Sequence, residues 1–363
     1  MTKQIGIIGG GGAIGRVVDH YFQELGYNTL ICDPSLPESL SLDEILESCK
    51  QLYITVFPLD VVVDILQKIS ARPDASQFVI LENSSIKTML DEPFIALDRQ
   101  GASICATHPL CKADQPWKNQ NVLLIPYGRN PDRATQLAQE LYNQAEMNIK
   151  DVASIADHDE LMAVLQLVPH LVLRMVSAVF TELGLDLDLL TSVATANFKL
   201  FYLSFWRVMV QNPSLSAAII GQLLEQEKGR EIYHRLMIAL QHAPLQDLQV
   251  MTDKFASFYE QSELTDDYMK RMNRQGIVTL ERLANLERRS ITISSTQNRI
   301  GLLRDILKPF DDLGINLNAI DSHFEGDTVH FEIGYDRGAT TKSLTELQRQ
   351  IQAMGHQVTI EHH

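Results

Sequence analysis

Residues 4–15 read QIGIIGGGGAIG, and this stretch decides the fold more than any other part of the chain. A short apolar strand pattern is followed by glycines at positions 10, 12 and 15 and then by a helical pattern over 16–25. Strand, glycine turn and helix in this order are typical of a dinucleotide fingerprint, in which the helix N-terminus receives the phosphates. We predict that Gly10 permits the tight turn, Gly12 admits a pyrophosphate and Gly15 brings helix and strand together.

A second strand pattern over 28–32 ends at Asp33, which stands 18 residues after Gly15. A carboxylate there can accept a hydrogen bond from the adenine ribose 2′-hydroxyl, which favours NAD over NADP. No Arg or Lys follows Asp33 before Lys50 to hold a 2′-phosphate. The predicted NAD site therefore consists of Gly10, Gly12, Ala13, Ile14, Gly15 and Asp33.

The composition narrows the class of protein. At 363 residues, 45% hydrophobic and 21% charged, the chain is long enough for two or three ordinary globular domains. A net charge of −15 argues against a nucleic-acid partner, because phosphate binding needs a basic surface. The four cysteines lack CxxC spacing, so we predict no metal site and no disulfide framework, and free thiols favour the cytoplasm. The longest apolar stretch, 161–173, contains Gln166 and His170, so we expect no membrane span.

Three domains of an α/β protein are predicted. Residues 1–154 alternate between strands and helices, which indicates a Rossmann-type doubly wound sheet that binds NAD. Residues 155–287 have a helical period, which favours a substrate and dimerisation domain, and Pro169 should kink its first helix. Residues 288–363 follow a βαββαβ order, which indicates a third domain of ferredoxin-like fold.

The sequence patterns predict the individual strands and helices of each domain. The strands of the first domain are expected at 4–9, 28–32, 51–57, 78–82, 102–107 and 121–126. Later helices of the second domain are expected at 193–211, 214–228, 230–242, 247–261 and 264–287. The third domain is expected to have strands at 291–295, 315–323, 328–335 and 357–361 and helices at 299–313 and 341–354.

Polar residues follow two of the predicted strands at their carboxyl ends, where open α/β sheets bind ligands. His108 follows the strand 102–107, and its imidazole can accept a proton from an alcohol as hydride leaves the same carbon. Ser85 and Lys87 follow the strand 78–82 and can hold an anionic or hydroxylated substrate. The alternative for His108 is a surface loop histidine.

Two histidines lie in the first helix of the second domain. His158 stands between Asp157 and Asp159, in a helix start that we assign to an Asp157 cap, so it is either part of that cap or functional. His170 follows Pro169 and is either satisfied by a carbonyl or functional. Twelve residues of helix rise about 18 Å, so the two imidazoles cannot contact one substrate atom.

Arg207 ends the aromatic run FYLSFWR at 201–207. A guanidinium among apolar side chains needs an anion, either an internal carboxylate or a substrate carboxylate held bidentately. Lys199, two turns earlier, either assists or is solvated.

The motifs GGGGAIG, SSIK, THPL, DHDELMAVLQLVPH and FKLFYLSFWRVMVQNPSLSAAII together resemble the prephenate/arogenate dehydrogenase family of tyrosine biosynthesis. The resemblance covers about residues 1–285. It implies that His108 deprotonates the ring C4 hydroxyl and that Ser85 orients His108. It also implies that Lys87 lies beside them, that His170 lines the pocket and that Arg207 binds a substrate carboxylate. The family often continues its His-Pro motif with Gly-Pro or Gly-Thr, whereas LCKA follows here at 110–113.

The implied reaction is the NAD-dependent oxidative decarboxylation of prephenate to 4-hydroxyphenylpyruvate. The alternatives are an arogenate dehydrogenase, a β-hydroxyacid-type dehydrogenase, and a non-catalytic regulator that senses NAD and an amino acid. No chorismate mutase segment precedes the glycine turn, so we expect no fused mutase. The chain is expected to form a homodimer and to have no membrane partner.

The C-terminal module resembles an ACT domain, in which a glycine turn receives an amino acid. The turn falls on Asn298, Gly301 and Leu302, the predicted regulatory residues, although Ile300 replaces the usual proline. The module either binds tyrosine as a feedback effector or serves dimerisation without a ligand.

Overall fold

The computed structural model describes residues 3–113, 115–210, 213–241, 289–325, 328–336 and 338–362, with a few isolated positions between 253 and 279. The chain divides into two compact units. The first comprises 1–190 and 203–242, and the second comprises 191–202 and 243–363. The predicted boundaries of three domains stay a prediction.

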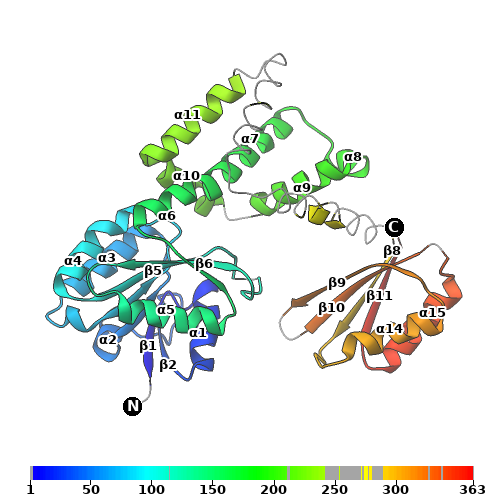
Figure 1. Cartoon of the computed structure of the whole chain (residues 1–363), viewed down its shortest axis with the longest axis horizontal. Helices are drawn as coiled ribbons and strands as arrows, with labels where there is room; N and C mark the ends of the chain where they lie inside the picture. The colour runs from blue at the N-terminus through cyan, green and yellow to red at the C-terminus, as the bar shows by residue number, and fades with distance from the viewer. Residues whose placement is uncertain are drawn as a thin grey trace. The chain divides into compact units, whose positions relative to one another are not determined.

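The first unit contains a seven-stranded sheet of order β2-β1-β3-β4-β5-β6-β7 (Figure 1). Its strands are β1 Gln4–Ile8, β2 Asn28–Cys32, β3 Gln51–Ile54, β4 Val79–Glu82, β5 Ser103–Pro109, β6 Asn121–Tyr127 and β7 Asn148–Asp151. The Rossmann-type fold is thereby confirmed. The sheet is not parallel throughout, because β6 runs antiparallel to β5. The described part of the segment between them contains no crossover helix, so the chain turns back directly.

Helices cover both faces of this sheet (Figure 1). The helices α1 Ala13–Glu24 and α5 Asp132–Gln144 pack on one face. The helices α2 Leu42–Ser48, α3 Leu59–Ser70 and α4 Asp91–Gln100 pack on the other, and the short 3₁₀ turns η1 Ala75–Gln77 and η2 Thr88–Leu90 flank β4. Each face therefore has its own apolar core, which holds the carboxyl ends of the strands in fixed positions.

A long helical segment follows the sheet. It consists of α6 Ile155–Met162, the π-helical turn η3 Ala163–Leu167 and α7 Val168–Glu182. Pro169 has no N–H to give to the carbonyl of Leu165, and the helix widens into a π turn just before it, at Ala163–Leu167; the predicted kink itself stays a prediction. The remaining described helices are α8 Leu187–Ser192, α9 Ala196–Met209, α10 Pro213–Glu225 and α11 Glu227–Gln241. The helices predicted at 247–261 and 264–287 lie outside the described residues, apart from isolated positions.

The continuous helix Ile155–Glu182 is long and apolar enough to cross a membrane by length and composition alone. This differs from the expectation drawn from 161–173, which covered only part of the helix. Only 17% of its most apolar window is buried in the single chain. Leu165 and Val179, for example, are 55% and 50% exposed. The helix therefore presents an apolar surface that the described chain does not cover.

The helical segment is fixed to the sheet by a small apolar cluster. Its buried members are Ile86, Leu123, Met162, Ala163, Leu167 and Leu223, and Leu110 and Leu171 pack against it. The cluster joins the loops after β4 and β5 to η3, the start of α7 and α10, so these segments meet at one place in the first unit.

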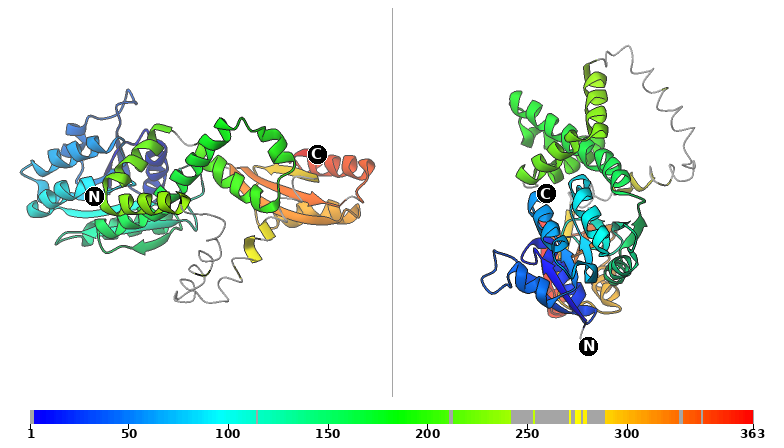
Figure 2. Two further views of the ribbon diagram at one scale, coloured as in Figure 1. Left: turned by 90° about the horizontal axis from the view of Figure 1, so that it is seen from above. Right: turned by 90° about the vertical axis from the view of Figure 1, so that its left-hand side faces the viewer.

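The second unit contains a four-stranded antiparallel sheet of order β11-β8-β10-β9. Its elements are β8 Arg289–Ser295, α14 Leu302–Asp312, β9 Leu317–Glu325, β10 Thr328–Tyr335, α15 Thr341–Ala353 and β11 Gln357–His362. Both helices lie on one face of the sheet over an apolar core (Figure 2). The predicted βαββαβ order is confirmed, and the ACT assignment stays a prediction.

Candidate active site

The glycine turn after β1 has the shape that a phosphate-binding turn requires. Its left-handed residue is Gly9, with φ +88°, and not Gly10, to which we had assigned the tight turn. A Cβ on Gly15 would lie 2.3 Å from the Gly9 carbonyl oxygen, so α1 can approach the turn only with glycine there. Gly12 caps α1, and among the described residues no side chain takes the first N–H groups of the helix, including those of Ala13 and Ile14, so they can bind an anion.

Asp33 closes the other side of this turn. Its Oδ2 accepts from the Gly11 N–H at 2.9 Å, and its Oδ1 accepts from the Ser35 N–H at 2.9 Å and from the Ser35 hydroxyl at 2.7 Å. The hydrogen bond from the Ser35 hydroxyl, against a smaller effect of burial, lowers the pKa of Asp33. An ionised acceptor beside free helix N–H groups fits the ribose and pyrophosphate of a dinucleotide.

Arg16 also lies beside this turn, where its Nε donates to the Gly11 carbonyl at 3.0 Å. Its charge contributes to the lowered pKa of Asp33. The sequence interpretation missed this base because it considered only the residues that follow Asp33.

A chain of three side chains lies at the carboxyl end of β5. His108 Nδ1 is 3.0 Å from His158 Nε2, and His158 Nδ1 is 2.7 Å from Asp159 Oδ1. All three side chains are buried, with exposures of 6% or less. We call this arrangement the His–His–Asp chain. It brings together the end of a sheet strand and the start of α6, which are 50 residues apart in sequence.

Asp159 anchors the chain. Its carboxylate accepts from the backbone N–H groups of Lys87 and Thr88, at 3.1 Å and 2.8 Å, and from Gln226 Nε2 at 3.1 Å. The Thr88 hydroxyl donates to it as well. Burial alone would raise the pKa of Asp159, but the hydrogen bonds from His158, Thr88 and Lys87 outweigh it and the pKa is lowered. Asp159 is therefore a carboxylate that only accepts hydrogen bonds.

This anchoring decides which nitrogens carry protons. Burial lowers the pKa of His158 despite the opposing hydrogen bond to Asp159, so its imidazole is neutral at neutral pH. Burial, followed by electrostatic interactions with His158 and Lys87, lowers the pKa of His108 well below its usual value. His158 Nδ1–H donates to Asp159, and its Nε2 accepts from His108 Nδ1–H. The remaining nitrogen of His108, Nε2, then holds a lone pair and is a candidate general base.

Lys87 has a different task from the one predicted. Its side chain is fully buried, and its Nζ donates to Glu82 Oε2 at 2.7 Å and to the Ser84 carbonyl at 2.8 Å. The ion pair secures the loop whose backbone binds Asp159. Ser85 is half-buried in the same loop, but among the described residues no hydrogen bond joins it to His108. His158 occupies the orienting position that we had expected for Ser85.

The predicted substrate contacts lie further along the helices. His170 is half-buried on α7, and its Nδ1 has no hydrogen-bond partner among the described residues. Arg207 on α9 is exposed, which differs from the burial that its aromatic run suggested, and its Nη2 is 3.4 Å from Gln115 Oε1. Lys199 lies on the same helix but within 191–202, which belongs to the second unit. Its contact with substrate stays a prediction.

The sequence left open whether His158 is functional or part of a helix cap. It did not predict Asp159, Thr88 or Gln226 as site residues. The helix starts earlier than expected, with Ser154 as its cap, so the predicted Asp157 cap is wrong and His158 is free to face the sheet. The pair His158-Asp159 at a helix start was the available signal.

The predicted regulatory turn lies before α14. Gly301 has φ +86° and caps the helix, which fits the need for glycine at this position. Asn298 is exposed, whereas the Leu302 side chain is buried in the apolar core and cannot contact a ligand at the surface.

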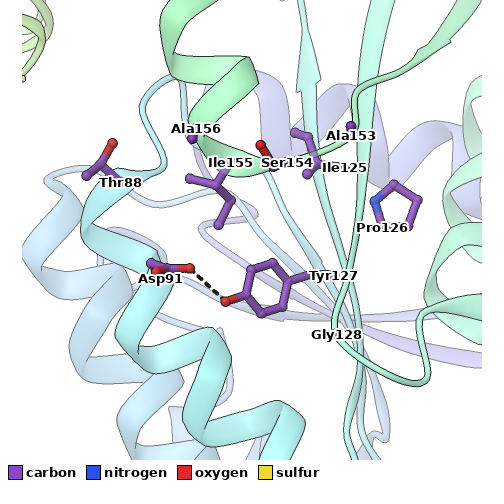
Figure 3. Close-up of a pocket in the computed structure, with 10 residues that line it drawn as sticks. All are labelled: Thr88, Asp91, Ile125, Pro126, Tyr127, Gly128, Ala153, Ser154, Ile155 and Ala156. Atoms are coloured by element: carbon purple, nitrogen blue, oxygen red, sulfur yellow. Dashed lines mark hydrogen bonds between the residues drawn. The ribbon is translucent and has the colours of Figure 1, made fainter. Parts of the chain in front are cut away.

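Two pockets lie in the first unit. One, of about 510 Å³, lies between the end of β6 and the start of α6, where Tyr127 donates to Asp91 at 2.7 Å (Figure 3). It contains none of the predicted site residues. The other, of about 480 Å³, is lined by Thr88, Asp159 and Gln226 among others and reaches the acid end of the His–His–Asp chain. Among the described residues, no three His, Cys, Asp or Glu side chains could hold a metal ion.

Residues 154–243 match the family model described as "Prephenate dehydrogenase, dimerization domain". Over 229 residues the chain is 22% identical to the "Probable arogenate/prephenate dehydrogenase" of Methanocaldococcus jannaschii, a match that covers 59% of this chain. It spans about half of that curated relative, 51% of its length.

Solved structures resemble this chain over most of their length. The prephenate dehydrogenase from A. aeolicus in complex with hydroxyphenyl propionate and NAD+ has a TM-score of 0.51 and 15% identity, covering 77% of this chain and 98% of that one. A putative prephenate dehydrogenase from Corynebacterium glutamicum has a TM-score of 0.55 and 14% identity. The match covers 76% of this chain and 97% of that one. At these identities the likeness concerns the fold. The chain therefore shares its fold with solved prephenate dehydrogenases over about three quarters of its length, and residues 154–243 match the dimerization-domain model of that family.

Proposed function

We propose that this protein is an NAD-dependent dehydrogenase that oxidises and decarboxylates prephenate to 4-hydroxyphenylpyruvate. The observation that carries the proposal is the His–His–Asp chain, because it leaves His108 neutral with a lone pair on Nε2. The glycine turn and Asp33 support NAD as the cofactor, as does the solved relative that binds NAD+.

His108 is suited to accept the proton of the ring C4 hydroxyl. Its pKa is far below the usual value, so the imidazole is already deprotonated at neutral pH. When bound, NAD supplies the acceptor for the hydride that leaves C4. His108 has to stand beside that carbon, at the strand end where Rossmann folds present the nicotinamide.

The other two members of the His–His–Asp chain hold the His108 ring in place while it carries the proton. Once Nε2 is protonated, Nδ1–H still donates to His158, and His158 still donates to the Asp159 carboxylate. This is the orienting role that an aspartate plays in a catalytic triad. Loss of the ring carboxylate as CO₂ leaves an electron pair that makes the ring a phenolate, and the phenolate takes the proton back from His108. Atoms and charge then balance without an external acid.

The direct test is NADH formation, followed at 340 nm, with prephenate and NAD. We expect turnover by the wild-type chain and a loss of about 10³-fold or more in kcat for His108→Asn, with NAD binding retained. His20→Asn, which changes an exposed histidine on α1, is the matched control. No NADH with either prephenate or arogenate would refute the proposal.

Arogenate is the second candidate substrate, because the curated relative is named for both substrates. The two differ only by a keto or an amino group on the side chain. The ratio of their kcat/KM values decides between them.

We further propose that the protein acts as a cytoplasmic homodimer that tyrosine inhibits. The dimerization-domain match and the exposed apolar helix Ile155–Glu182 support a dimer, and light scattering of the full chain tests it. The glycine turn at Gly301 supports an amino-acid effector. Tyrosine inhibition that is equal in wild type and Asn298→Ala would remove that turn from regulation.

A further inference from the structure

Arg174 on α7 has an unusual environment. Its Nε and Nη2 atoms are buried, and neither has a hydrogen-bond partner among the described residues. His170 precedes it by one helical turn, and its buried Nδ1 is unpartnered in the same way. Residues four apart on a helix lie on one face, so the two unmet groups are neighbours. Two guanidinium nitrogens shielded from water without an acceptor are costly, which indicates that this place can bind an anion that the described residues do not supply.

A second cation, Lys112, lies near Arg174 and His170. Burial lowers the pKa of His170, and the two charges that lower it further are those of Arg174 and Lys112. Both are positive, in a chain whose net charge is −15. Lys112 is half-buried and lies in the LCKA sequence that follows the His-Pro motif. Asp114, in the same loop, lies outside the described residues. Lys112 and Arg174 therefore lie close enough to His170 to lower its pKa, and among the described residues no carboxylate opposes that effect.

This cationic cluster is tied to His108 by the chain itself. Leu110, two residues after His108, packs with Leu171 in the apolar cluster that fixes α7 to the sheet. The Gln115 side-chain oxygen accepts from the Lys112 N–H and from Arg207, both at 3.4 Å. The segment that follows His108 therefore contains Lys112 and, through Gln115, contacts Arg207, the predicted carboxylate-binding residue.

We propose that Lys112, His170 and Arg174 form a second anion subsite, which binds the side-chain carboxylate of the substrate while His108 takes the ring hydroxyl. The inference rests on the proposed function and names the substrate class more closely. The ring carboxylate loses its charge as CO₂, so a desolvated group of cations around it would oppose the reaction. The side-chain carboxylate keeps its charge throughout, and binding it affects ground and transition states alike. Arg207 is left for the ring carboxylate.

The subsite also predicts which of the two substrates is preferred. The side-chain carboxylate of prephenate is next to a neutral keto group, and that of arogenate is next to an ammonium group. The basic groups of the subsite repel the ammonium group of arogenate. The subsite therefore selects prephenate by disfavouring arogenate. We therefore expect a higher kcat/KM for prephenate than for arogenate.

The test uses the full chain loaded with NAD and the variant Arg174→Gln. Calorimetry compares 4-hydroxyphenylpropionate, an anion, with uncharged 4-hydroxyphenylethanol. We expect Arg174→Gln to weaken the anion by about 10- to 100-fold and the alcohol by less than about twofold. KM for prephenate should rise by a similar factor while kcat changes by less than about threefold. Arg174→Lys should retain part of the affinity, and Arg235→Gln, which changes an exposed arginine paired with Glu231, should match wild type.

Three results would overturn the subsite: equal weakening of both probes, no preference of the wild type for the anion, or dissociation of the Arg174→Gln oligomer with no change in its anion affinity. The last would place Arg174 in a subunit contact. The proposed function fails separately. If anion binding depends on Arg174 but neither prephenate nor arogenate is oxidised, the subsite stands and the assigned reaction does not.

Discussion

The His–His–Asp chain and the cationic cluster of Lys112, His170 and Arg174 differ in how many of their polar atoms have hydrogen-bond partners. At the His–His–Asp chain, the Asp159 carboxylate accepts from two backbone N–H groups and from the side chains of His158, Thr88 and Gln226. At the cationic cluster, Arg174 and His170 have buried nitrogen atoms with no partner among the described residues. A group that must keep one protonation state is best held by fixed partners, whereas a group that must bind an anion has to leave donors unused. The contrast therefore separates the catalytic end from the binding end.

The largest effect is expected from breaking the completed end with Asp159→Asn. The amide oxygen takes the place of Oδ2, which accepts from Thr88 and Gln226, so the NH₂ group faces His158 Nδ1 and reverses the His158 tautomer. His108 then loses the acceptor for Nδ1–H, and its Nε2 is no longer kept free of a proton. We expect kcat to fall by about 10³- to 10⁴-fold, with KM for prephenate nearly unchanged. Steady-state kinetics and circular dichroism check this result together.

The control for that variant is Asp157→Asn, which changes the neighbouring acid of the same helix start but leaves the His–His–Asp chain intact. A similar loss of kcat in both variants would assign the effect to the helix cap. An Asp159→Asn protein that keeps its fold and its turnover would show that the tautomer does not matter.

A smaller effect is expected at the open end from Arg207→Ala. Arg207 is exposed in the single chain and is 3.4 Å from Gln115, so an ion pair formed there is weakened by water. We expect KM for prephenate to rise by about 3- to 10-fold, less than for the buried Arg174, with kcat little changed. The KM values of the Arg207→Ala and Arg174→Gln variants show which of the two arginines contributes more to substrate binding. A larger effect at Arg207 than at Arg174 would reverse the assignment of the two carboxylates.

The smallest effect concerns stability against pH and again separates the two ends. The folded pKa values of His108 and His158 lie below the value near 6.5 of an unfolded histidine, so the unfolded chain binds more protons in acid. The stability present above about pH 6.5 should fall as pH decreases, by up to about 1.4 kcal/mol per pH unit for each histidine. Denaturant midpoints between pH 5 and 8 measure this slope, and His108→Asn should reduce it. An unchanged slope would contradict the buried neutral state.

Local sequence patterns were enough for most of the fold. The glycine turn with its flanking strand and helix, and the βαββαβ order of the last module, depend on residues close together in sequence, and both were predicted correctly. The strand β7 was missed because its sequence, NIKD, is polar and largely exposed. The antiparallel pairing of β6 was missed because strand direction depends on the connection and not on the strand pattern.

The site was harder to predict because its groups meet only through tertiary packing. His108 could be proposed from its place at a strand end, but nothing local reveals that His158 lies 3.0 Å from it. Lys87 was expected to face substrate because its pairing with Glu82 depends on how the loop after β4 folds back. Arg174 drew no attention in the sequence, since an arginine in an apolar helix is informative only once its surroundings are known.

The central claim is that His108 is held as a neutral imidazole with its proton on Nδ1 and a lone pair on Nε2. The most direct measurement is ¹⁵N NMR of the histidine side chains in the NAD-loaded protein at pH 7, with His108→Asn to assign the signals. The account predicts a protonated Nδ1 and an unprotonated Nε2 for His108, changing only at a pH well below 6.5. A proton on Nε2 at pH 7 would contradict it.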